Sequence, residues 1–160
     1  CQRPFLFRIT AIDLARHMLR VAEENVARAG LRDRIQLACV DAKQLPYPDG
    51  SFGAVISNSI VHHIPEPKVV LAEMLRVVRP GGLLFVRDLM RPDDLATVYH
   101  FVAVYAGDAN DHQRQMFRDS LRAALTLEEV RQLLSEIGLP ADAAAPTSDR
   151  HWTIVARRGD

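Results

Sequence analysis

The sequence predicts an α/β fold in which helices cover both faces of a mostly parallel β-sheet. Short apolar runs rich in β-branched residues alternate with stretches whose apolar residues recur at helical spacing, which is the pattern of buried parallel strands and their crossover helices. Two of the apolar runs end directly in an acid, Asp13 and Asp41. An acid in this position lies at the carboxyl edge of a parallel sheet, where such folds bind their ligands.

The elements are predicted in the order strand, helix, strand, strand, helix, strand. The first helix follows Asp13 directly and ends at Gly30, a natural C-terminal stop. The second helix opens at Pro67 and is closed by the Pro-Gly-Gly run at 80–82. The predicted strands cover residues 9–13, 35–40, 54–58 and 83–86.

This alternation is interrupted at 92–125, where two helices are inserted before the next unit. We expect the insertion to be a lid over the substrate within a single domain that spans 1–160. A capping-box sequence at Thr126 starts a further helix. The remaining predicted elements are helices at 93–106, 111–124 and 126–138, a weak edge strand at 141–146 and a final strand at 152–156.

The composition limits the classes of partner. The 160 residues suffice for one domain with a sizeable core, and 20 basic and 20 acidic side chains give zero net charge, which argues against nucleic acid or an anionic membrane. No apolar run approaches the roughly 20 residues of a membrane span. Two cysteines, Cys1 and Cys39, cannot form a disulfide framework, so we expect a reduced, cytoplasmic chain.

Asp13 is the first candidate ligand. An ionised carboxylate at this position can accept hydrogen bonds from both hydroxyls of a ribose. The alternative role is the N-cap of the helix that follows, for which Asp is a favoured residue. The strand before Asp13 favours the ribose role and therefore a nucleotide-type cofactor.

Asp41 and Ala42 close the next strand at the same edge of the sheet. The carboxylate of Asp41 can accept the exocyclic amine of an adenine, while the small Ala42 lets the ring lie against the backbone. A solvated loop acid is the alternative. Leu14 and Met18 lie one helical turn apart and can either pack on the same nucleoside or belong to the core under the helix.

The segment from Asn58 to Pro65 leaves the third strand at this edge and contains the pair His62 and His63. Adjacent residues of a loop point in different directions, and no third ligand has suitable spacing, so we expect no metal site. One of the two histidines is expected to face a substrate, and a structural loop histidine is the alternative.

Two catalytic motifs are absent from the sequence. The lack of a Tyr-x-x-x-Lys motif weakens the case for a nicotinamide-dependent oxidoreductase of the short-chain type. The lack of Gly-x-x-x-x-Gly-Lys-Ser/Thr leaves P-loop chemistry without support.

Several motifs occur together in order. They are Ile12-Asp13-Leu14-Ala15 with Met18, Val40-Asp41-Ala42, the loop 45–53, His62-His63-Ile64-Pro65 and Arg79-Pro80-Gly81-Gly82. As a set they resemble class I S-adenosylmethionine-dependent methyltransferases, especially the small-molecule group similar to enzymes of ubiquinone and menaquinone biosynthesis. The resemblance implies a Rossmann-like, doubly wound sheet.

The resemblance also implies S-adenosylmethionine as the cofactor. Asp13 matches the acid that binds its ribose, with Leu14 beside it. Asp41 and Ala42 match the pair at the adenine. Asn58 matches the residue near the methionine moiety. The family's first strand and glycine-rich loop have no counterpart in this chain, so we expect it to be a fragment of a longer protein.

The implied reaction is in-line transfer of a methyl group to a small-molecule acceptor. It needs alignment of the nucleophile, the methyl group and the sulfur, and exclusion of water. His62 or His63 is the candidate base for a protonated acceptor. The insertion offers further substrate contacts: Tyr99, Phe101, Tyr105, Met116, Phe117, Arg114, Arg118 and Arg122. A nicotinamide-dependent oxidoreductase and a non-catalytic methyltransferase fold that acts as a partner subunit are the alternatives.

Overall fold

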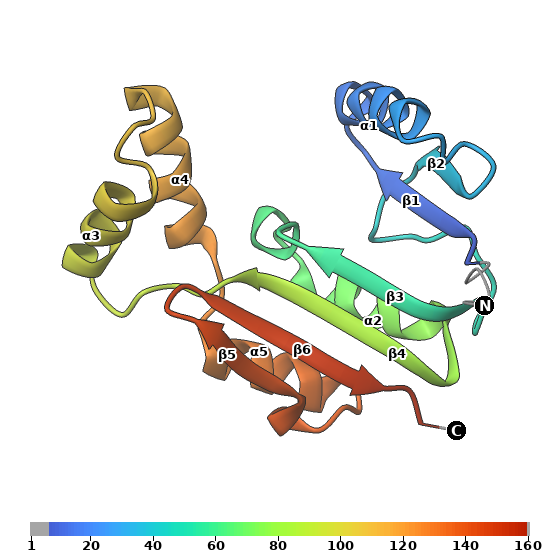
Figure 1. Cartoon of the computed structure of the whole chain (residues 1–160). Helices are drawn as coiled ribbons and strands as arrows, with labels where there is room; N and C mark the ends of the chain where they lie inside the picture. The colour runs from blue at the N-terminus through green and yellow to red at the C-terminus, as the bar shows by residue number, and fades with distance from the viewer. Residues whose placement is uncertain (1–6, 160) are drawn as a thin grey trace, which may run out of the picture. The chain divides into compact units, whose positions relative to one another are not determined.

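The computed structural model describes residues 7–159, and Figure 1 shows their helices and strands. All elements of the predicted order are present. The strands are β1 (Ile9–Asp13), β2 (Ile35–Cys39), β3 (Phe52–Asn58), β4 (Val78–Leu89), β5 (Ala144–Ser148) and β6 (His151–Arg157). The helices are α1 (Arg16–Arg28), α2 (Pro67–Val77), α3 (Leu95–Tyr105), α4 (Asp111–Ala123) and α5 (Leu127–Glu136), with short 3-10 turns η1 (Val61–His63) and η2 (Ala141–Ala143).

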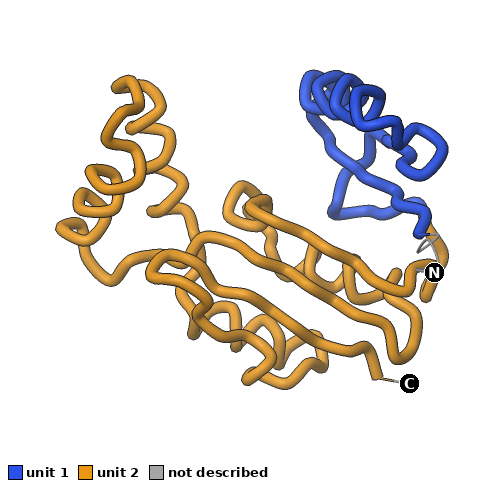
Figure 2. The backbone as a smooth tube through the Cα atoms, in the orientation of Figure 1, with its two compact units in different colours: residues 1–46 blue, residues 47–160 orange. Residues whose placement is uncertain are grey.

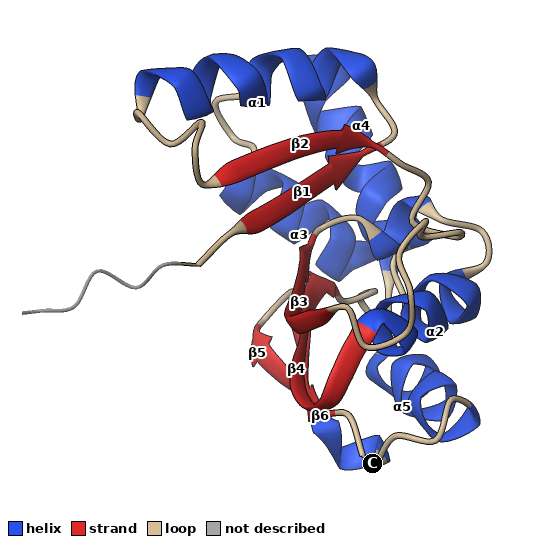
Figure 3. Ribbon diagram, turned by 90° about the vertical axis from the view of Figure 1, so that its right-hand side faces the viewer, coloured by secondary structure: helices blue, strands red, loops and turns tan. Residues whose placement is uncertain are grey.

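The chain divides into two compact units after Pro46 (Figure 2). In the first unit, β1 and β2 pair in parallel, from Ile9 opposite Ile35 to Asp13 opposite Cys39. Helix α1 connects the two strands and lies against them (Figure 3). This unit is therefore one parallel βαβ unit, as the strand and helix patterns predict.

In the second unit, four strands form a sheet in the order β3-β4-β6-β5. β3 and β4 are parallel, whereas β6 is antiparallel to both of its neighbours. Helices α2 and α5 lie on one face of this sheet (Figure 3). The helices and strands together bury an apolar core that includes Val70, Leu71, Leu84, Val86, Val130, Leu134, Trp152 and Ile154.

The insertion forms the two helices that the sequence predicts. α3 begins after Asp94, whose side chain accepts the backbone N–H of Thr97, and α4 begins with a capping box between Asn110 and Gln113. A second apolar cluster joins these helices to the end of β4. Its buried members are Leu89, Val98, Phe101, Val102, Leu121 and Ala124.

The largest departure from the predicted elements is at 80–82. The sequence favours a helix stop there and a strand that covers only 83–86. Instead, α2 ends at Val77, and β4 runs without a break from Val78 to Leu89. The prediction that the Pro-Gly-Gly run closes the helix and precedes the strand was wrong.

The pairing of β4 with β3 explains this difference. Phe52 pairs with Val78, and the next pair is Ala54 with Leu83, so β4 carries extra residues in a bulge. Gly81, with φ of 70°, supplies the left-handed backbone that this bulge needs. Turn residues inside a strand therefore mark a bulge here and not a strand boundary.

Replacing Gly82 by Ala is expected to destabilise the second unit by about 1–3 kcal/mol. A Cβ at Gly82 would lie 2.7 Å from Cγ1 of Val78, 2.8 Å from the carbonyl oxygen of Arg79 and 2.9 Å from that of Gly53. Two of these atoms are backbone and cannot move freely. Urea unfolding followed by circular dichroism measures the loss, and Gly159→Ala, which meets no atom within 4 Å, is the control. Equal stability of the two variants would contradict this account of the bulge.

The cysteine and membrane predictions can be compared with the described residues only in part. Cys39 carries a free, exposed thiol, whereas Cys1 lies outside the described residues. Within 7–159, no helix is both long and apolar enough to cross a bilayer.

Candidate active site

Two carboxylates stand at the carboxyl ends of neighbouring strands in the first unit. Asp13 is the last residue of β1, and it pairs in register with Cys39, the last residue of β2. The backbone N–H of Val40 donates to the carbonyl oxygen of Asp13 at 3.2 Å, so the two segments remain paired just beyond the end of β2. Asp41 follows immediately. Asp13 and Asp41 therefore lie at the same edge of the sheet.

Asp13 is half-buried and has one oxygen held by the backbone. Its Oδ1 accepts the N–H of Ala15 at 2.7 Å. The N-cap residue of α1 is Ala15, so Asp13 does not occupy the cap position itself. Within residues 7–159, no group hydrogen-bonds to Oδ2 of Asp13. This oxygen can accept a hydroxyl from a ligand.

Asp41 has a similar arrangement. Its Oδ1 accepts the N–H of Lys43 at 2.9 Å, and the ammonium of Lys43 lies 3.9 Å from Oδ2. Leu14 and Met18 are 64% and 51% exposed, so neither belongs to a core in the part of the chain that the structure describes. Exposed apolar side chains next to two carboxylates suit a ligand with polar and apolar parts.

In the second unit, β3 ends at Asn58, which is exposed and pairs in register with Arg87 of β4. The next residue, Ser59, has φ of 57°, and its N–H donates to the carbonyl oxygen of Arg87 at 2.9 Å. A positive φ is costly for a residue other than glycine, and such strain concentrates at ligand sites. The turn after Asn58 is therefore a candidate ligand contact of the second unit.

His62 and Asp88 form a buried pair beyond this turn. Asp88 is 0% exposed, the side chain of His62 is 5% exposed, and Nδ1 of His62 lies 2.5 Å from Oδ1 of Asp88. The N–H of Val61 donates to Oδ2 of Asp88 at 2.6 Å, and that of Leu89 donates to Oδ1 at 2.7 Å. The structure therefore shows Asp88 holding the ring of His62.

The protonation of this pair follows from its surroundings. Burial by itself would raise the pKa of Asp88, but the hydrogen bonds from His62, Leu89 and Val61 outweigh it and hold that pKa below its ordinary value. Because the carboxylate is ionised and accepts from Nδ1, the proton of a neutral His62 is on Nδ1. Its Nε2 then has a free lone pair and can accept a proton.

His63 has a different environment. Its ring centroid lies 3.9 Å from that of His62, and the residue is exposed. Partial burial and the neighbouring His62 lower its pKa, although Asp88 opposes this. Among the described residues, no carboxylate hydrogen-bonds the ring of His63 as Asp88 does that of His62. Among residues 7–159, no three His, Cys, Asp or Glu side chains gather as a metal ion would require.

Replacing Asp88 by Asn is expected to cost roughly 1–3 kcal/mol of stability at pH 7, because a buried donor loses its acceptor. The pKa of Asp88 is lower in the folded protein than its ordinary value of 3.8. Its contribution is therefore complete above about pH 4 and is lost as the pH falls through the folded pKa. In urea unfolding, the free energy of unfolding of Asp88→Asn should lie well below that of the wild type at pH 7 and closer to it at pH 3. A stability difference that does not depend on pH, or an equal loss of stability in the exposed control Asp33→Asn, would contradict this role of the Asp88 carboxylate.

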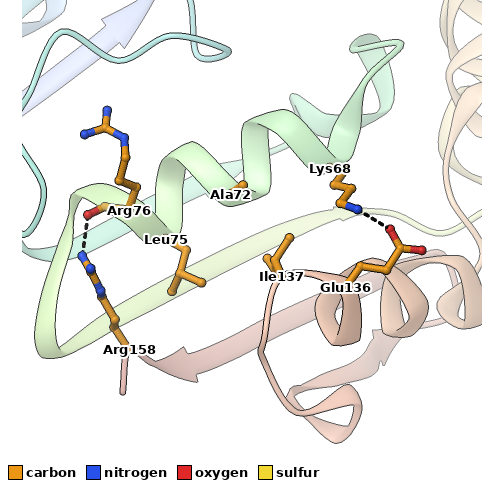
Figure 4. A pocket seen from close by; sticks show the side chains of 7 residues that line it. All are labelled: Lys68, Ala72, Leu75, Arg76, Glu136, Ile137 and Arg158. Atoms are coloured by element: carbon orange, nitrogen blue, oxygen red, sulfur yellow. Dashed lines mark hydrogen bonds and ion pairs between the residues drawn. The ribbon is translucent and has the colours of Figure 1, made fainter. Parts of the chain in front are cut away.

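A hollow of about 420 Å³ lies between α2 and the end of α5 (Figure 4). Its charged groups are engaged with one another or with the backbone. Lys68 forms an ion pair with Glu136 at 2.8 Å, and Arg158 donates to the carbonyl oxygen of Arg76. The lining has no histidine or unpaired carboxylate that could accept a proton, so we assign no chemistry to it.

The chain belongs to the methyltransferase domain family. The family model matches residues 1–86, a stretch that contains Asp13, Asp41, Asn58, His62 and His63. The chain is 30% identical over 154 residues to 27-O-demethylrifamycin SV methyltransferase of Amycolatopsis mediterranei, covering 94% of this chain and 53% of that protein. It is 35% identical over 85 residues to demethylmenaquinone methyltransferase of Desulfitobacterium hafniense, covering 53% of this chain and 34% of that protein.

Solved structures confirm the Rossmann-like fold of this class. An S-adenosylmethionine-dependent methyltransferase from Aquifex aeolicus superposes with a TM-score of 0.67 and 18% identity, covering 94% of this chain and 69% of that one. The cyclase SpnF superposes with a TM-score of 0.60 and 19% identity, covering 96% and 67% of the two chains. Since one neighbour is a cyclase, the fold alone does not define the reaction. The chain spans about half, or less, of the length of these curated relatives.

Proposed function

We propose that the protein transfers the methyl group of S-adenosylmethionine to a small-molecule acceptor. The observation that carries this proposal is the family match over 1–86, since the same residues place two carboxylates at one sheet edge. The cofactor would supply an electrophilic methyl group on a positively charged sulfur. The residues of the chain then have to bind, orient and, for a protonated acceptor, remove a proton.

Five residues of the first unit suit the nucleoside part of the cofactor. We assign the ribose to Asp13, because its Oδ2 has no partner among the described residues and an ionised carboxylate suits paired hydroxyls. Asp41 and Ala42 are assigned to the adenine. Leu14 with Met18 would cover the apolar faces of the nucleoside. Asn58 is assigned to the methionine end, on the family resemblance and on the strained turn that follows it.

We assign proton removal from the acceptor to His62. Its Nδ1 is held by Asp88, so Nε2 can accept the proton while the carboxylate stabilises the imidazolium that forms. An oxygen acceptor fits this arrangement, because a hydroxyl must lose its proton when it is methylated. The name of the relative from Amycolatopsis mediterranei places its methylation on an oxygen, which supports the same class here.

We also propose that further chain outside these 160 residues pairs with the free strand edges. Among residues 7–159, β1 pairs only with β2, and β3 pairs only with β4. Such edges expose backbone donors and acceptors, and on β3 the side chain of Ile56 is 72% exposed. The intact mass of the endogenous protein should exceed 17.9 kDa. A mass equal to that of the 160 residues would contradict this. We further propose a cytoplasmic location, because two cysteines among 160 residues cannot form a disulfide framework.

Isotope transfer tests the proposed activity. The native gene product is incubated with S-adenosylmethionine labelled with ¹³C in the methyl group and with a small-molecule extract of its host. Mass spectrometry should find a labelled methyl group on one or a few small molecules, and His62→Gln should remove the signal. Label found only on protein or nucleic acid in a parallel fraction would contradict the small-molecule proposal.

A further inference from the structure

A second hollow, of about 360 Å³, lies in the second unit under the inserted helices. We call it the acceptor pocket. Its main lining residues are Leu89, Tyr105, Gln113, Phe117, Arg150 and His151. They come from the end of β4, from α3 and α4, from the turn before β6 and from the start of β6. Its volume lies within the range of small-molecule sites, roughly 300–1,000 Å³.

The pocket is built on two elements that also support the proposed base. Leu89 directly follows Asp88, the residue that holds His62. Helix α4, which contributes Gln113 and Phe117, packs against the η1 turn that contains His62. The pocket and the proposed base therefore share β4 and α4 as supporting elements.

The lining offers no uncompensated charge. The guanidinium of Arg150 forms an ion pair with Asp149 at 3.0 Å, and its carbon lies 3.4 Å from the centroid of the Tyr105 ring. The hydroxyl of Tyr105 donates to the other oxygen of Asp149, and this hydrogen bond raises the pKa of the tyrosine. These three residues neutralise one another at the rim. Leu89 and Phe117 supply the apolar part of the lining.

His151 is a buried polar group of the pocket with capacity for a ligand. It is buried, and its Nδ1 lies 2.7 Å from the hydroxyl oxygen of Ser148, which fixes the ring. Burial, together with Arg87 and Arg150, lowers the pKa of His151, so the ring is neutral at pH 7. In the part of the chain that the structure describes, Nε2 of His151 has no hydrogen-bond partner.

We propose that the acceptor pocket binds the apolar body of an uncharged acceptor and that Nε2 of His151 hydrogen-bonds one of its oxygens. This inference rests on the proposed function, since it assigns the acceptor of that reaction. It makes His151 a specificity residue. A charged acceptor is disfavoured because no free counter-charge lines the pocket, and desolvating an unpaired charge is costly. A neutral phenol or alcohol with an apolar ring system fits this lining.

The test uses 1-naphthol as a neutral probe and 1-naphthoate as its charged counterpart. Binding to the native gene product is followed by probe fluorescence. We expect 1-naphthol to bind about tenfold or more tightly than 1-naphthoate. Ala109→Trp, which fills the turn beside the pocket, should weaken 1-naphthol binding about tenfold or more. The matched control Ala103→Trp, on an exposed position of α3, should leave it unchanged.

The role of His151 is tested with two variants. His151→Leu should weaken 1-naphthol binding about fivefold, as expected for one lost hydrogen bond, whereas His151→Gln should retain binding within about twofold. Equal effects of Leu and Gln, tighter binding of 1-naphthoate, or no 1-naphthol binding by the wild type would overturn the proposal. S-adenosylhomocysteine binding is measured in parallel. A wild type that binds no S-adenosylhomocysteine would refute the proposed function. Pocket variants that lose 1-naphthol binding but keep S-adenosylhomocysteine binding would show that the pocket and the cofactor site are tested separately.

Discussion

The variant His62→Gln is expected to lower the methyl-transfer rate by about 10²–10⁴-fold, which is the usual contribution of a positioned general base. Asp88 holds Nδ1 of His62 at 2.5 Å, so Nε2 is the atom that we propose takes the acceptor's proton. Gln cannot take up a proton there. Single-turnover kinetics with the acceptor found by isotope transfer measure the rate. Affinity for S-adenosylhomocysteine should change by less than about twofold, because His62 is not assigned to the cofactor.

His63→Gln is the matched control for this result. The two histidines are adjacent, and their ring centroids are 3.9 Å apart, but no carboxylate within 7–159 hydrogen-bonds His63. We therefore expect His63→Gln to keep the rate within a few-fold of the wild type. A full rate in His62→Gln would remove the assignment of the base to His62. A larger loss in His63→Gln would transfer the assignment to His63.

The variant Asp13→Ala is expected to weaken S-adenosylhomocysteine binding about 100-fold. Two hydrogen bonds from ribose hydroxyls to an ionised carboxylate, at the lower limit of about 1.5 kcal/mol each, contribute about 3 kcal/mol together, which corresponds to roughly 100-fold in affinity. Oδ1 of Asp13 also accepts the N–H of Ala15, so part of the effect could come from the local turn. Isothermal titration calorimetry measures the affinity.

Asp13→Asn and Asp33→Ala control for these two contributions. Asn can still accept the N–H of Ala15 but lacks the charge, so its affinity should fall between those of the wild type and Asp13→Ala. Asp33 is an exposed acid in the same unit, before β2, and its removal should leave affinity unchanged. Wild-type affinity in Asp13→Ala would contradict the ribose assignment.

The parts of the fold that depend on local sequence could be predicted. The β-branched run before Asp13 and the helical spacing after it correspond to β1 and α1. Asn110 opens α4 where the periodicity begins. The extent of β4 could not be predicted, because the bulge depends on the pairing of Val78 with Phe52, which is far away in the sequence.

In the candidate site, too, the features set by local sequence could be predicted and those set by long-range contacts could not. Parallel pairing brings Asp13 and Asp41 to one edge, which follows from acids at the ends of adjacent strands. The sequence singles out two histidines but does not distinguish them, because the difference is a long-range contact of His62 with Asp88. His151 has no sequence motif around it. Its position in the pocket follows from the pairing of β6 with β4, opposite Leu89.

Calorimetric titration of the native gene product with S-adenosylhomocysteine tests the central claim most directly. We predict one-to-one binding that is unaffected by an excess of NADH. A folded protein that binds no S-adenosylhomocysteine would contradict the account and favour a non-catalytic partner subunit. Displacement by NADH would instead favour a nicotinamide-dependent oxidoreductase.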